Sequence, residues 1–163
     1  MERLPRRATA PEVVALVIAD PHLNPAAVEL DTFLPQPPQA VWRALTTPAV
    51  LQRWFLKPTG FTPSVGTTFH FTTPDSPTDQ ITCKVLAARP AELLSYSWLY
   101  PHATHSAHYI VTWHLSPEGH GTRLFLTQTG FDPTIPRHRM LRNAADRSWK
   151  RLLLPRLAQA ILR

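Results

Sequence analysis

The chain has 163 residues, 44% of them apolar, and a formal charge of +6 from 17 basic and 11 acidic side chains. This length and composition predict one domain with a sizeable hydrophobic core. A disulfide scaffold is excluded because Cys83 is the only cysteine, and a lone thiol fits a reducing cytoplasm, where we expect the protein to reside. A small buried hydrophobe is the favoured interpretation of Cys83, over a reactive thiol.

An apolar run at residues 13–19, behind Arg3, Arg6 and Arg7, is the first feature in chain order. It is too short to span a bilayer, and no convincing signal-peptide cleavage site follows it. We therefore interpret residues 1–25 as an N-terminal extension and residues 26–163 as the folded domain. No membrane span is expected.

Six strands and two short helices are predicted next. Alternation from Val28 to Leu34 indicates a first half-buried strand. Pro37 and Pro38 suit a first helical turn, and Pro48 ends one short helix and begins another. Alternating apolar residues then predict five more strands, centred near Phe69, Cys83, Tyr96, Val111 and Leu124.

The last predicted element is a long helix from about Pro136 to Leu162. Its expected apolar stripe, which should pack on the sheet, consists of Leu141, Ala145, Trp149, Leu152 and Leu153. Pro155 interrupts this helix, because it lacks the N–H that would bond to the Arg151 carbonyl. Such a residue costs about 3 kcal/mol or more unless the helix kinks or ends there.

Four stretches in this order resemble the START-like (SRPBCC, helix-grip) superfamily, and within it the bacterial relatives of the activator of the heat-shock-protein-ninety ATPase (AHSA type). The stretches are the helix pair at residues 37–55, then 65–71, 89–98 and 121–131. The resemblance implies an α+β helix-grip fold for residues 26–163. In that fold a six-stranded antiparallel sheet wraps around the long C-terminal helix, and two short helices lie between strands one and two.

The resemblance also implies a pocket between sheet and helix for an apolar or aromatic small molecule, such as a lipid. Aromatic residues with a few polar tips are the usual lining of such a site, although the same residues would also describe a filled core. Gln128 is the most telling, because an inward amide needs a partner. The expected ligand-binding residues are Trp54, Phe55, Phe69, Phe71, Tyr96, Trp98, Trp113, Leu126, Gln128, Leu141 and Trp149.

Basic residues are concentrated at the end of the chain, where eight lysines and arginines follow Ile135 and Asp146 is the only acidic residue. A solvated helix face explains this pattern, and so does an interaction surface for an acidic protein partner. The resemblance implies chaperone-ATPase stimulation, a stress-response role, as the alternative function. Nucleic acid is disfavoured because no recognition motif is present. The expected partner-binding residues are Arg139, Arg147, Lys150 and Arg151.

The sequence favours binding over catalysis. His102, His105 and His108 are spaced three apart, but they fall in a predicted loop, so we expect no metal. There is no Gly-x-Ser-x-Gly elbow, no phosphate loop and no inward pair of carboxylates. We therefore expect no catalytic residues and no cofactor, in a monomer or homodimer, with a cyclase-type enzyme as the third alternative.

Overall fold

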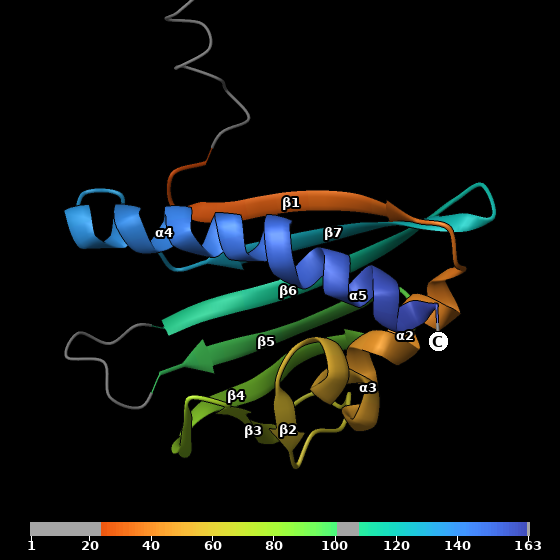
Figure 1. The fold of residues 1–163 in the computed structure, drawn as a ribbon, viewed down its shortest axis with the longest axis horizontal. Helices are drawn as coiled ribbons and strands as arrows, with labels where there is room; N and C mark the ends of the chain where they lie inside the picture. The colour runs from red at the N-terminus through yellow and green to blue at the C-terminus, as the bar shows by residue number, and fades with distance from the viewer. Residues whose placement is uncertain (1–23, 101–107, 163) are drawn as a thin grey trace, which may run out of the picture.

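One antiparallel sheet forms the body of the molecule in a computed structural model, which describes residues 24–100 and 108–162 (Figure 1). Its strands follow the order β1-β7-β6-β5-β4-β3-β2. They are β1 (Ala27–Leu34), β2 (Lys57–Thr59), β3 (Thr68–Thr73), β4 (Ser76–Arg89), β5 (Leu93–Leu99), β6 (His108–Glu118) and β7 (Gly121–Thr129). The α+β class, with a C-terminal helix on the sheet and two short helices, is confirmed.

The sheet has seven strands, so the prediction of six was wrong. The additional strand is β2, in which Lys57, Pro58 and Thr59 pair antiparallel with Thr72, Phe71 and His70 of β3. Three residues are too few to show alternation, and a central proline normally argues against a strand. Pro58 is tolerated because β2 is the edge of the sheet.

The two short helices close one end of the sheet. Helix α2 (Pro38–Thr46) and helix α3 (Pro48–Trp54) each have a proline in the first turn, where the missing N–H costs nothing. Their apolar sides bury Val41, Leu45 and Leu51. The Trp54 indole N–H donates to the Ala44 carbonyl at 2.9 Å and so ties the two helices together.

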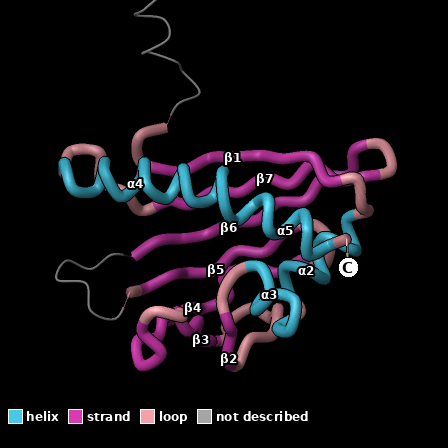
Figure 2. The backbone as a smooth tube through the Cα atoms, in the orientation of Figure 1, coloured by secondary structure: helices cyan, strands magenta, loops and turns pink. Residues whose placement is uncertain are grey.

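The C-terminal helix has three parts, which run on as one helix in Figure 2. They are α4 (Pro136–Ser148), the π-helical turn η1 (Trp149–Leu153) and α5 (Leu154–Ile161). In the π turn, the Leu154 N–H donates to the Trp149 carbonyl five residues back. Pro155 thereby falls in the first turn of α5, where its missing N–H is tolerated.

The π turn changes which side chains face the sheet. No residue of α4 is fully buried, whereas α5 buries Leu154, Leu157 and Ala160. The expected stripe was therefore wrong at Leu141 and Leu152, which are 38% and 45% exposed. One extra residue in the turn rotates the helix surface, so a stripe counted at ordinary helical spacing drifts off the core.

One face of the sheet carries the C-terminal helix, and we call it the inner face. The core lies between this face and the helix. The inward-facing residues predicted on the last three strands are buried, among them Tyr96, Trp113 and Leu126. No helix within residues 24–100 and 108–162 is long and apolar enough to cross a membrane. Residues 1–23 of the expected extension, and likewise His102 and His105, lie outside the described residues.

Candidate functional site

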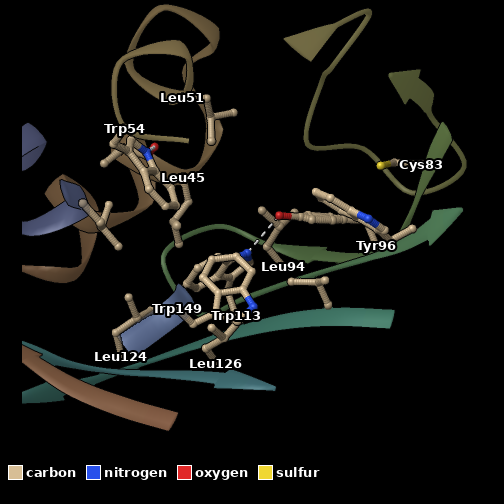
Figure 3. Packing of buried hydrophobic residues seen from close by; sticks show 14 of the residues in the cluster. Leu45, Leu51, Trp54, Cys83, Leu94, Tyr96, Trp113, Leu124, Leu126 and Trp149 are labelled. Atoms are coloured by element: carbon tan, nitrogen blue, oxygen red, sulfur yellow. Dashed lines mark hydrogen bonds between the residues drawn. The ribbon is translucent and has the colours of Figure 1, made fainter. Parts of the chain in front are cut away.

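The half of the inner face beneath α2, α3 and α5 is solidly packed, and we call it the filled end. It contains Trp54, Tyr96, Trp113 and Leu126, all buried (Figure 3). Phe69, which is also buried, packs edge to face on Tyr96. The Trp113 indole N–H donates to the Tyr96 hydroxyl at 3.1 Å. Burial raises the pKa of that hydroxyl, and the Trp113 hydrogen bond offsets part of the rise. The indole N–H groups of Trp54 and Trp113 are thus both paired inside the protein.

The other half of the inner face, the cavity end, encloses a cavity of about 400 Å³. Its floor comes from the sheet and its roof from the C-terminal helix, at the π turn. The lining residues include Phe55, Ile81, Trp98, Tyr100, Val111, Gln128, Ala145, Ser148, Trp149, Leu153 and Arg156. This volume is within the range of small-molecule sites.

Four of the eleven expected ligand-binding residues line this cavity, namely Phe55, Trp98, Gln128 and Trp149. The other seven do not line it. Trp54, Phe69, Tyr96, Trp113 and Leu126 are packed in the filled end, and Phe71 is buried beside it. Leu141 lies on the exposed part of α4, away from the cavity.

Aromatic rings form one wall of the cavity. Phe55, directly after α3, stacks on Trp98 at a centroid distance of 5.7 Å and lies 5.3 Å from the Trp149 ring. Trp149 in turn meets Trp113 edge to face at 5.4 Å. The wall is therefore held from both sides, by the helix pair and by the packed core. Such a preformed apolar surface favours flat or apolar ligands.

The polar centre of the cavity is the amide of Gln128. The Trp149 indole N–H donates to Gln128 Oε1 at 2.8 Å. An indole N–H can only donate, so the amide oxygen must face Trp149, and the orientation of the amide is fixed. The Gln128 NH2 group, by contrast, makes no hydrogen bond within the described part of the chain. The amide therefore uses only its oxygen in hydrogen bonds to the described residues.

A second donor near the cavity lacks a partner. The Trp98 Nε1 atom is buried and makes no hydrogen bond with any described residue. Burial raises the pKa of Tyr100, and the nearby Trp98 N–H partly offsets that rise, so the two groups are close. They do not meet hydrogen-bond geometry. A buried donor without a partner costs about 1–3 kcal/mol.

Sequence reasoning missed several lining residues. Val111 was detectable, because it alternates with two inward aromatic residues on β6. Ala145 lay on the expected helical stripe, but its small side chain gave no reason to assign it to a site. Arg156 had no signal, since its placement depends on the π turn.

The expected partner-binding residues are all exposed on the C-terminal helix. Arg139 donates to the Pro133 carbonyl at 3.0 Å. Arg147, Lys150 and Arg151 make no ion pair among the described residues. Arg142 differs, because it donates to the Ala27 carbonyl at 2.8 Å and lies 3.5 Å from Asp146, which fixes α4 on β1.

Within residues 24–100 and 108–162, no three His, Cys, Asp or Glu side chains come together in a metal-binding arrangement. Cys83 is buried on β4, and burial raises the pKa of its thiol to about 12. A thiol held protonated is a poor nucleophile. Cys83 therefore packs in the core, and its thiol is not activated as a nucleophile.

The sheet, helix pair and C-terminal helix define a START-like helix-grip domain, and comparisons with known proteins identify its family. The protein-family model described as "Activator of Hsp90 ATPase homolog 1-like protein" matches residues 35–161. The chain belongs to this family. No match was found among curated protein sequences.

Solved structures share the fold across most of the chain. Protein MLL2253 from Mesorhizobium loti is 31% identical, with a TM-score of 0.76 over 84% of this chain and 97% of that chain. CV1439 from Chromobacterium violaceum is 24% identical, with a TM-score of 0.69 over 86% and 99%. CalU16 from Micromonospora echinospora is also 24% identical, with a TM-score of 0.65 over 83% and 75%.

Proposed function

We propose that the protein is a binding module that holds an apolar or aromatic small molecule in the cavity between the sheet and the C-terminal helix. The observation that carries this proposal is the Gln128 amide, oriented by Trp149 and with its NH2 group unused among the described residues. An amide with a purely structural role is expected to use both its oxygen and its NH2 group in hydrogen bonds to neighbouring residues. The free end sits in a largely apolar hollow, which is the arrangement of a ligand site.

A cavity-filling variant tests this proposal. Ala145 lines the cavity, and its neighbour Ala144 is exposed and does not. N-phenyl-1-naphthylamine, a neutral aromatic probe, is titrated into the protein by isothermal calorimetry. We expect Ala145→Phe to weaken its binding at least about tenfold, because the ring occupies the ligand's volume.

Ala144→Phe is the matched control and should bind the probe like the wild type. Equal affinity in both variants, or no binding by the wild type, would contradict the proposal. Native mass spectrometry of protein purified from its own host then identifies what the cavity retains. A reproducible small molecule in near-stoichiometric amount is the expected result.

A second candidate is a protein-interaction role for the basic helix surface, of the kind that stimulates a chaperone ATPase. The supporting observation is that Arg139, Arg147, Lys150 and Arg151 are all exposed on the C-terminal helix, where they can meet an acidic partner. The test is ATP hydrolysis by the host's heat-shock-protein-ninety chaperone. Stimulation that disappears in an Arg147→Glu, Lys150→Glu, Arg151→Glu variant supports this role, and absence of stimulation by the wild type excludes it.

A further inference from the structure

The cavity borders a second hollow at the end of the C-terminal helix. This groove has a volume of about 620 Å³ and lies between α3 and the helix. Three of its lining residues are arginines, with Arg53 from the end of α3, Arg151 from the π turn and Arg156 from α5. The fold brings Arg53 beside Arg151 and Arg156, from which it is about 100 residues distant in the sequence.

The three arginines are uncompensated. None of them forms an ion pair or hydrogen bond within the described part of the chain, and no acidic residue lines the groove. Arg123, by contrast, contacts both Asp31 and Glu118. Unpaired guanidinium groups around one hollow create a positive potential that attracts oxyanions.

Arg156 connects the groove to the cavity, because it lines both. Asp75, on the turn between β3 and β4, also lines the cavity but not the groove. A ligand with an apolar body in the cavity and a negative group would thus be repelled at the Asp75 side and attracted at the Arg156 side. The two charges therefore determine which end of the cavity the negative group of a ligand would occupy.

We infer that the cavity's ligand is an amphipathic anion, whose apolar body lies against Phe55 and Trp149 while its carboxylate or other oxyanion binds Arg156. Arg53 and Arg151 complete the anion site on the groove side. The unused NH2 group of Gln128 fits the same chemistry, because it requires an acceptor atom on the ligand. This inference rests on the cavity being a ligand site, as proposed above.

Two probes with the same aromatic body separate charge from shape. They are 1-anilinonaphthalene-8-sulfonate and N-phenyl-1-naphthylamine, which differ only in the sulfonate group. Calorimetric titration of the folded, full-length protein should give about three- to tenfold tighter binding of the sulfonate probe, the effect of one partly exposed charge-assisted contact. Raising the salt concentration should reduce this preference.

Variants of Arg156 assign the preference to its side chain. Arg156→Gln should remove the preference while binding of the neutral probe is unchanged, and Arg156→Lys should keep most of it. Arg139→Gln is the matched control, because it removes the same charge from the helix surface away from the groove. Thermal unfolding checks that each variant remains folded.

The outcomes distinguish this inference from the proposed function. Loss of the preference in Arg156→Gln, with retention in Arg139→Gln, supports it. Equal binding of the two probes by the wild type, or a preference that survives in Arg156→Gln, overturns the anion site and leaves the cavity proposal standing. Failure of both probes to bind overturns both.

Discussion

The filled end and the cavity end of the inner face are built from the same kinds of residue but differ in how their polar tips are used. At the filled end, the Trp113 indole N–H donates to the Tyr96 hydroxyl oxygen. At the cavity end, Trp149 uses only the oxygen of Gln128, and the NH2 group stays free among the described residues. An aromatic lining alone therefore does not distinguish core from site, whereas a cavity that a polar group lines does.

The C-terminal helix produces this difference. After the π turn, α5 presses Leu157 against the helix pair and closes the filled end. Before the turn, α4 lies over β1 and buries no side chain completely (Figure 1). The space between α4 and the central strands is consequently left for the cavity, which Ala145 borders with only a methyl group.

The largest effect is expected from truncation at the filled end. Trp113 is 1% exposed and surrounded by packed rings, so Trp113→Ala should lower the free energy of unfolding by about 3–5 kcal/mol. Trp149→Ala should cost less, because one side of that ring already faces a cavity. Urea denaturation measures both values. Equal losses would indicate that the two ends are packed alike.

The two halves of the C-terminal helix should respond very differently to the same substitution. Leu157→Ala should cost about 2–5 kcal/mol, since Leu157 is fully buried. Leu141→Ala should change stability by no more than about 0.5 kcal/mol, as at other surface positions. Thermal and urea unfolding of both variants provide the comparison. A large loss in Leu141→Ala would mean that α4 packs on the core.

A double-mutant cycle measures the contact that orients the cavity amide. Gln128→Met should cost about 1–3 kcal/mol, because it leaves the Trp149 N–H buried without a partner. In a Trp149→Phe background no such N–H remains, and the same substitution should cost about 1 kcal/mol less. Additive effects in urea denaturation would show that the Gln128–Trp149 hydrogen bond does not contribute.

The smallest effect is expected at Cys83, whose thiol should not react in the folded protein. Its thiol is buried with a pKa of about 12, so almost no thiolate is present at pH 8. A disulfide exchange reagent should therefore label it only as fast as the protein unfolds. Rapid labelling under native conditions would show that the sheet opens locally near β4.

Much of the sheet could be predicted from the sequence, because period-two alternation survives wherever one face is buried. Tyr96, Trp113 and Gln128 face inward as that pattern predicts. The edge strand β2 could not be predicted, since three residues around Pro58 carry no periodicity. Its pairing is a tertiary effect.

The limits of the cavity were also beyond the sequence. They depend on the position of the single π turn, which contains one residue more than an ordinary helical turn. Pro155 indicated that the helix is disturbed near this point, but it did not indicate which kind of disturbance occurs. A kink, a helix end or a π turn would each accommodate it. The placement of Arg156 between cavity and groove follows from that choice, so the anion site appears only in three dimensions.

A ligand should enter the cavity end and leave the filled end unchanged. The most direct test is a two-dimensional 15N–1H spectrum of the tryptophan indole N–H groups during titration with N-phenyl-1-naphthylamine. We expect the largest shifts at Trp98 and Trp149, with small shifts at Trp54 and Trp113. Shifts concentrated at Trp54 and Trp113, or none at a saturating probe concentration, would contradict it.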